Sequence, residues 1–190
     1  MGSRNSPRAN TFDALFTRNS DPWDFETSDY ERAKRVATIA ALNGRRFTSA
    51  LELGCATGVL TQQLARSCDA VIAMDVSKRA LRIAKERETE CETIDYRWGE
   101  IPRDWPNGMF DLTVFSEILY FLSADEIGTV SRLAMNSLLP RGMCLLVNWT
   151  GASDLPISGD DVVSVFHAAG GWDIETVQNT PLYRIDRLIQ

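Results

Sequence analysis

The chain has 190 residues, of which 44% are hydrophobic and 24% charged, and its formal net charge is -6. This length suits one ordinary domain, and the composition excludes a disordered or fibrous protein. The negative charge disfavours a protein that holds long nucleic acids, because such binding depends on clustered Lys and Arg. We therefore expect one packed, water-soluble domain.

Residues 1–20 are rich in Ser, Asn and Arg and show no sustained apolar period. This pattern is typical of a flexible leader that contributes little to a core. We expect the single domain to span residues 21–190.

The first helix of the domain is predicted from a capping box, Ser28 followed by Glu31. Val36, Ile39 and Ala40 recur at helical spacing as its apolar face, and Asn43-Gly44 supplies a stop signal. Arg32 and Arg35 are predicted to lie on other faces of this helix.

From residue 50 onward, short apolar or β-branched runs alternate with helical stretches, which indicates an α/β fold with a parallel sheet and helices on both faces. Five parallel strands are predicted at 50–54, 70–76, 94–98, 110–116 and 143–149, with helices near 59–67, 77–90 and 124–138 between them. Ser158 is placed to cap a further helix toward His167, and residues 172–178 and 182–189 are predicted to close the sheet with antiparallel pairing.

No membrane span, secretory signal or metal site is expected. The longest apolar runs, such as Met143–Val147, are far shorter than the roughly 20 residues of a membrane-spanning helix. Residues 1–8 are polar, so we expect a reducing, cytoplasmic setting. The cysteines at 55, 68, 91 and 144 lack metal-ligand spacing and there is one histidine, which predicts free thiols and no metal.

The segment Glu52–Gly58 places two glycines, Gly54 and Gly58, in the turn that follows the first strand. A tight turn without side chains lets a ligand lie against the main chain, and the amides at the helix start favour an anionic group. Asp75 ends the second strand, where a carboxylate accepts hydrogen bonds from ribose hydroxyls, and Glu100 follows the third strand, where it is placed to recognise an adenine amino group.

Each of these signals alone has a structural explanation, since such turns occur for folding reasons and a terminal Asp often caps a helix. Their order at the ends of consecutive strands favours a nucleotide-bearing ligand. The spacing differs from the G-x-G-x-x-G fingerprint of dinucleotide dehydrogenases, which argues against NAD.

With Glu-Leu-Gly-Cys-Ala-Thr-Gly at 52–58 and Ser-Glu-Ile-Leu-Tyr-Phe-Leu at 116–122, the chain resembles the class I S-adenosylmethionine-dependent methyltransferases. Asp21-Pro22-Trp23 and Tyr30-Glu31-Arg32 narrow the resemblance to the nodulation protein S (NodS) family.

The resemblance implies a Rossmann-like, seven-stranded, mostly parallel sheet with a final antiparallel strand, and S-adenosylmethionine as the methyl donor, converted to S-adenosylhomocysteine. It also implies N-methylation of an amino sugar on a deacetylated chitooligosaccharide. By the same resemblance Arg32 holds the methionine carboxylate of the cofactor, while Gly54, Asp75 and Glu100 occupy the turn, ribose and adenine positions.

Further cofactor contacts are expected from residues beside these positions. Trp23 and Tyr120 are either core aromatics or cation–π partners of the sulfonium. The remaining expected contacts are Glu52, Cys55, Gly58, Val76, Ile101 and Ser116.

Glu117 and Tyr120 are the candidate catalytic residues, because Glu117 directly follows the fourth strand and Tyr120 lies one helical turn beyond. A carboxylate there is placed to orient an acceptor amine or remove its proton. The structural alternative for Glu117 is a helix cap. The loop 148–156 is expected to border the acceptor site, and Tyr120, Phe121 and Trp149 are candidates for stacking on a sugar.

Two other functions stay open on the sequence. One is a methyltransferase of another small metabolite amine, hydroxyl or carboxyl group, with a closed cavity in place of an open glycan groove. The other is a binding or regulatory protein that keeps the cofactor fold without catalysis.

Overall fold

The computed structural model of the chain describes residues 6–87, 93–152 and 154–189. The helices are α1 (Pro7–Arg18), α2 (Asp29–Ala40), α3 (Val59–Ala65), α4 (Lys78–Arg87), α5 (Ala124–Ser137) and α6 (Gly159–Gly170), with a short 3-10 helix η1 (Leu119–Phe121). The strands are β1 (Ala50–Leu53), β2 (Val71–Asp75), β3 (Ile94–Trp98), β4 (Phe110–Ser116), β5 (Leu138–Trp149), β6 (Asp173–Asn179) and β7 (Tyr183–Ile189).

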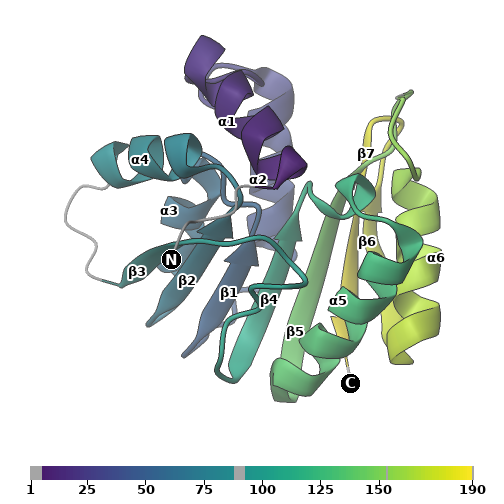
Figure 1. Ribbon diagram of the computed structural model, residues 1–190. Helices are drawn as coiled ribbons and strands as arrows, with labels where there is room; N and C mark the ends of the chain where they lie inside the picture. The colour runs from purple at the N-terminus through teal and green to yellow at the C-terminus, as the bar shows by residue number, and fades with distance from the viewer. Residues whose placement is uncertain (1–5, 88–92, 153, 190) are drawn as a thin grey trace.

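The strands form one seven-stranded sheet in the order β3-β2-β1-β4-β5-β7-β6 (Figure 1). Strand β7 runs antiparallel to both of its neighbours, β5 and β6, whereas β1 to β5 pair in parallel. The predicted α/β class and the mostly parallel sheet with one antiparallel strand are therefore confirmed. Strand β5 begins five residues earlier than predicted, because Leu138 pairs with Phe110 across an irregularity in the register.

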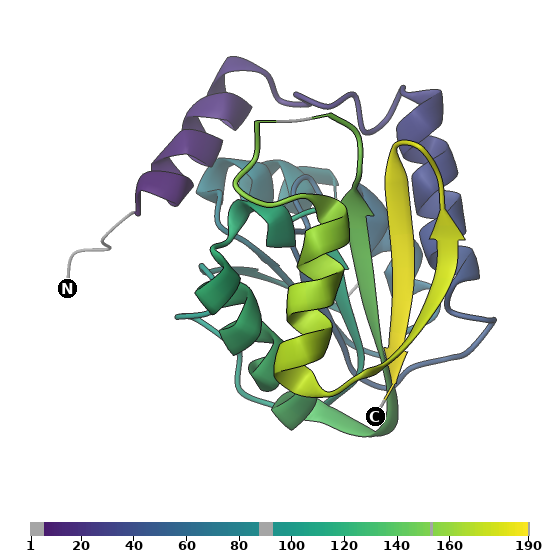
Figure 2. The ribbon, with the colours of Figure 1, turned by 90° about the vertical axis from the view of Figure 1, so that its right-hand side faces the viewer.

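Helices cover both faces of the sheet, as Figure 2 shows. One core joins the sheet to α3, α4 and the end of α2 through residues such as Leu42, Leu64 and Leu81. The other joins it to α5 and α6 through residues such as Val130 and Phe166. Strands β1 to β3 are added toward one edge of the sheet and β4 and β5 toward the other, so the strand order reverses between β1 and β4. A crevice at the carboxyl ends of the strands is expected at such a switch point.

Residues 7–18 differ from the expected flexible leader, because they form helix α1. Ser6 caps this helix by accepting a hydrogen bond from the Ala9 amide, and a proline at its start suits the first turn. Ala9 and Phe16 are buried, and the helix contacts α4 above the upper end of the sheet in Figure 1. The segment lacks a conventional apolar stripe because its aromatic residues face a cavity shared with other elements.

Helix α2 begins after Ser28 as predicted, but the face that it buries is polar. Glu31, Lys34, Arg35 and Thr38 point inward, while Val36 is 62% exposed. Of the predicted apolar face, Ile39 packs against the core, whereas Val36 and Ala40 are exposed, because the inward side of α2 also borders a cavity. Within the described residues, no helix is both long and apolar enough to cross a membrane.

Candidate active site

A cavity of about 880 Å³ opens at the carboxyl ends of β1, β2 and β4 and is closed over by α1 and α2. It brings together eleven of the residues expected in the site: Trp23, Glu52, Gly54, Cys55, Asp75, Val76, Glu100, Ile101, Ser116, Glu117 and Tyr120. Arg32 and Gly58 do not line it.

The two glycines of the β1–α3 turn are explained by protein neighbours. Gly54 has φ +84°, and a Cβ there would lie 2.1 Å from Ile118 Cγ2. Gly58, the cap residue before α3, lies in the left-handed region, and a Cβ there would lie 2.5 Å from the Tyr96 hydroxyl. The space that a side chain would occupy at either glycine is therefore filled by the chain itself, which is a structural reason for both glycines. The turn still places Gly54, Cys55 and Ala56 on the cavity wall.

Glu52 presents an unpaired acid to the cavity. Its side chain is 1% exposed, and neither carboxylate oxygen has a hydrogen-bond partner within the described part of the chain. Burial is the main reason that its pKa is raised to about 7; the nearby Thr61 side chain opposes this rise, and the charge of Asp75 adds to it. A buried carboxyl group without a partner fits a cationic ligand group, such as the ammonium of an amino acid.

Asp75 is held at the end of β2 by two backbone amides. One oxygen accepts from the Ala56 amide at 2.9 Å and the other from the Ser77 amide at 2.8 Å. Burial raises its pKa to about 6 despite these bonds. A carboxylate has about four lone-pair sites, so two remain for a pair of ligand hydroxyls.

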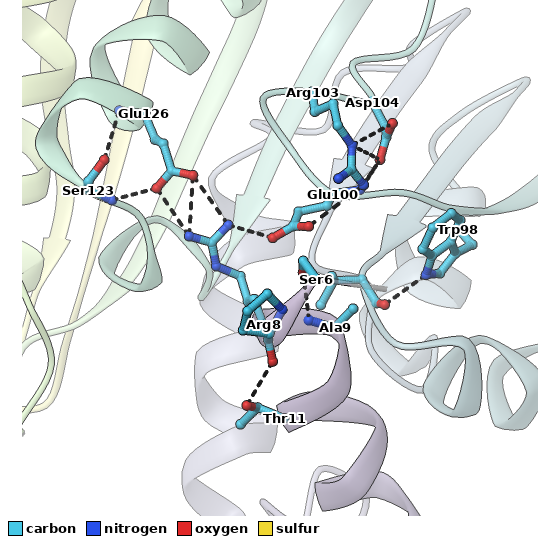
Figure 3. A network of polar contacts seen from close by, with 12 residues as sticks. Ser6, Arg8, Ala9, Thr11, Trp98, Glu100, Arg103, Asp104, Ser123 and Glu126 are labelled. Carbon is cyan, nitrogen blue, oxygen red and sulfur yellow. Dashed lines mark hydrogen bonds and ion pairs between the residues drawn. The ribbon is translucent and has the colours of Figure 1, made fainter. Parts of the chain in front are cut away.

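Glu100 lies on the cavity wall in an ion-pair network with α1 and α5 (Figure 3). Its Oε1 accepts from Arg8 Nη1 at 2.9 Å, and Arg8 also pairs with Glu126 at 3.1 Å. Arg8 thus ties α1 to the loop after β3 and to the start of α5. The sequence showed no signal for Arg8, because its partners are 92 and 118 residues away.

The structure places Arg32 on the exposed side of α2, where it pairs with Asp29. Successive residues of a helix are separated by about 100°, so Glu31, Lys34, Arg35 and Thr38 share one face and Arg32 lies on another. Lys34 and Arg35 are the cations of α2 that line the cavity. Glu31, Lys34 and Arg35 recur at helical spacing, and this pattern in the sequence could have predicted a polar face turned inward.

Glu117 is the centre of a polar cluster at the end of β4. Its Oε2 accepts from the Trp149 amide at 3.0 Å and from the Tyr120 hydroxyl, and its Oε1 lies 2.9 Å from Lys34 Nζ. Lys34 also pairs with Glu31 at 2.9 Å. Glu117 has φ +59°, a strained conformation for a non-glycine residue. It does not cap a helix, because Ile118 is the cap residue of η1.

Aromatic rings form much of the remaining cavity wall. Trp23, which is 40% exposed, packs with Phe12, Phe16 and Phe25 at centroid distances of 5.5 to 6.4 Å. Tyr120 packs against Phe121 at 4.8 Å. The last residue of β5, Trp149, and Leu155 of the loop after it line the same cavity.

The cysteines at 55, 68 and 144 are buried free thiols, and Cys91 lies outside the described residues. In the segments that the structure describes, there is no group of three or more His, Cys, Asp or Glu residues that could hold a metal ion.

Comparison with known proteins assigns the chain to a family. Residues 14–141 match the family model "Nodulation protein S (NodS)". The chain is 29% identical to nodulation protein S of Bradyrhizobium diazoefficiens over 171 residues, which cover 88% of this chain and 77% of that protein. It is 26% identical to that of Sinorhizobium fredii over 170 residues, covering 88% and 75%.

The fold is similar to that of the N-methyltransferase NodS from Bradyrhizobium japonicum WM9, solved in complex with S-adenosylhomocysteine. The TM-score is 0.83 at 21% identity, covering 96% of this chain and 98% of the other. The chain therefore belongs to the nodulation protein S family and is an S-adenosylmethionine-dependent methyltransferase.

Proposed function

We propose that this enzyme transfers the methyl group of S-adenosylmethionine to the neutral amine of an amino sugar or a deacetylated chitooligosaccharide. The observation that carries the proposal is the Glu117, Tyr120 and Lys34 cluster, which faces the same cavity as the cofactor-type residues of β1 and β2. The names of the relatives supply the class of acceptor.

The residues at the strand ends fit the parts of this cofactor. The unpaired Glu52 carboxylate suits the ammonium of the methionine moiety, Asp75 has lone pairs left for the ribose hydroxyls, and Glu100 lies at the expected adenine position. The bound cofactor supplies an electrophilic methyl group on a sulfonium. The protein has to align the acceptor with that methyl, and alignment of reactants contributes on the order of 7 to 11 kcal/mol.

The acceptor amine must lose a proton before it attacks, because an ammonium ion has no free lone pair. Tyr120 donates to Glu117, so its oxygen is free to accept a hydrogen bond from the amine. Glu117 is the carboxylate that receives a proton passed through Tyr120. Lys34 pairs with both Glu117 and Glu31 and offsets part of their negative charge.

The aromatic residues favour a flat ring as the body of the acceptor. Tyr120, Phe121 and Trp149 line the cavity and suit stacking on a sugar face. A second candidate, another small metabolite amine, is favoured by the apolar cover that Phe12, Leu15 and Phe16 of α1 place over the site.

Titration calorimetry with S-adenosylhomocysteine, followed by a methyl-transfer screen, tests the proposal. The screen compares glucosamine oligomers, small primary amines, and alcohols or carboxylic acids of similar size. Transfer to a glucosamine oligomer supports the amino-sugar acceptor, and transfer to another amine supports the second candidate. Transfer only to oxygen, or to none of these acceptors, contradicts N-methylation.

We also propose a reducing, cytoplasmic location, which the three buried free thiols support.

A further inference from the structure

Tyr30 lines the cavity but takes no part in the proton transfer proposed for Tyr120 and Glu117. It lies in the first turn of α2 and lines the cavity beside Glu31 and Lys34. Its hydroxyl oxygen is buried and has no hydrogen-bond partner among the described residues. A buried hydroxyl without a partner costs free energy, so a substrate group that pairs with it is a physical reason to keep it.

The ring of Tyr30 is held firmly in place. It packs edge-on against Trp149 at 5.7 Å and against Tyr183 at 5.8 Å. The Lys34 ammonium lies 4.9 Å from the ring centroid. The hydroxyl therefore has a fixed position relative to the Glu117 cluster, which also contacts Lys34 and Trp149.

The Tyr30 hydroxyl remains protonated near neutral pH. Burial, followed by the negative charges of Glu117 and Glu31, raises its pKa above the usual value of 10. Because the hydroxyl has no hydrogen-bond partner among the described residues, its oxygen lone pairs are free for a donor. Tyr120 is in a similar position, because burial and Glu117 raise its pKa and its proton is donated to Glu117.

A neutral primary amine carries two N–H donors and one lone pair. We propose that the Tyr30 and Tyr120 hydroxyl oxygens each accept a hydrogen bond from one N–H of the acceptor amine. These two bonds direct the lone pair of the amine toward the methyl group of the cofactor. This inference rests on the N-methylation proposed above. The lone pair forms the new N–C bond as the C–S bond breaks, and the bonding electrons pass to sulfur. The product leaves as an N-methylammonium ion.

This arrangement makes Tyr30 a specificity-determining residue. An amine that already carries one methyl group has a single N–H and satisfies only one of the two oxygens. The wild-type enzyme is therefore expected to prefer a primary amine over its N-methyl derivative, since a site built to bind an N–H rejects an analogue that lacks it.

The test compares Tyr30→Phe with Tyr183→Phe. Tyr183 packs on the same ring but does not line the cavity, so it controls for loss of a hydroxyl from the aromatic cluster. Each variant is measured for melting temperature, for S-adenosylhomocysteine affinity by calorimetry, and for kcat/KM on the primary amine that the wild-type enzyme methylates and on its N-methyl derivative.

For Tyr30→Phe we expect an unchanged or higher melting temperature and unchanged affinity for S-adenosylhomocysteine. We expect kcat/KM on the primary amine to fall roughly 10-fold, and the preference for the primary amine over its N-methyl derivative to become smaller. Tyr183→Phe is expected to match the wild type. A Tyr30→Phe enzyme with wild-type kinetics and selectivity, or an equal loss in Tyr183→Phe, overturns the role of Tyr30 alone. A wild-type enzyme that methylates no amine overturns the proposed function and this inference with it.

Discussion

Glu52, Asp75 and Glu117 face one cavity but differ in the donors that surround them. Glu52 has no hydrogen-bond partner among the described residues, Asp75 accepts from two backbone amides, and Glu117 is surrounded by an amide, a hydroxyl and an ammonium. Donors stabilise the charged form of a carboxyl group, whereas burial without them favours the neutral form. Glu52 is therefore the carboxyl group with the most to gain from a cationic ligand.

The raised pKa of Glu52 makes the stability of the ligand-free protein depend on pH. The folded-state pKa of about 7 exceeds the ordinary value of 4.5, so between these values the folded state binds a proton that the unfolded state has released. This group therefore lowers the free energy of unfolding as pH rises from about 4.5 to 7. We expect Glu52→Gln to raise that free energy by roughly 2 kcal/mol at about pH 8 and to weaken binding of S-adenosylhomocysteine.

Denaturant unfolding at about pH 5 and pH 8, with calorimetry of the cofactor product, measures both effects. The exposed Glu86→Gln on α4 is the matched control and should change neither. An equal dependence of stability on pH in Glu52→Gln and the wild type would contradict the prediction.

Glu117 is expected to act on the acceptor rather than on the cofactor. Glu117→Gln keeps an oxygen for the Trp149 amide but removes the charge and the proton acceptor. We expect turnover to fall by about 100-fold, in line with general acid–base catalysis, while affinity for S-adenosylhomocysteine is preserved. Steady-state kinetics measures turnover and calorimetry measures the affinity. Glu175→Gln, at an exposed position on β6, is the control. Unchanged turnover in Glu117→Gln would show that Glu117 has no part in the mechanism.

At the scale of elements, α2 presents a charged stripe to the cavity rather than packing an apolar stripe on the sheet. Lys34, with a side chain 9% exposed, lies between Glu31 and Glu117, which come from different elements. Arg32, two residues earlier, points to solvent. A rotation of about 200° along the helix separates these two cations, so one is part of the site and the other is not.

The contrast between Lys34 and Arg32 is measurable. Lys34→Met leaves two neighbouring buried or half-buried carboxylates without their shared cation, and we expect it to lower the free energy of unfolding by about 3 kcal/mol. Arg32→Met removes only an exposed pair and is expected to change it by less than about 0.5 kcal/mol. Denaturant unfolding of both variants checks this, and similar losses in the two would show that α2 is oriented differently.

At the scale of the whole molecule, α1 bridges the two halves of the sheet. Arg8 lies between Glu100, which follows β3, and Glu126 of α5, and it pairs with both (Figure 3). Phe12, Leu15 and Phe16 of the same helix line the cavity. Any ligand in the cavity is therefore enclosed by contacts that α1 makes with distant segments.

Loss of this bridge should speed the release of ligand. We expect Arg8→Gln to raise the dissociation rate of S-adenosylhomocysteine by about fivefold, a modest effect because the Arg8 side chain is 25% exposed and its ion pairs are partly screened. Stopped-flow release measures it, and added salt should reduce the difference from the wild type. Arg18→Gln, at the exposed end of the same helix, is the control; equal release from both variants and the wild type would contradict a bridging role.

The sequence alone determined the α/β class, the order of strands and helices, and the positions of Asp75, Glu100 and Glu117 at strand ends. These features follow from local patterns: alternation of apolar runs, a glycine turn, and caps such as Ser28 and Ser158, both of which accept the expected amide bond. A cap or a strand depends on residues close to it in the chain, so its signal is contained in a short window.

Only the tertiary structure decided which sides of α1 and α2 face the cavity, and with them the positions of Arg8, Tyr30 and Lys34. A helix of polar and aromatic residues has no unique inward face until the cavity beside it is known, because each side chain is selected by partners far along the chain. The sequence thus determined what the elements are, and packing between distant segments decided which of their side chains form the site.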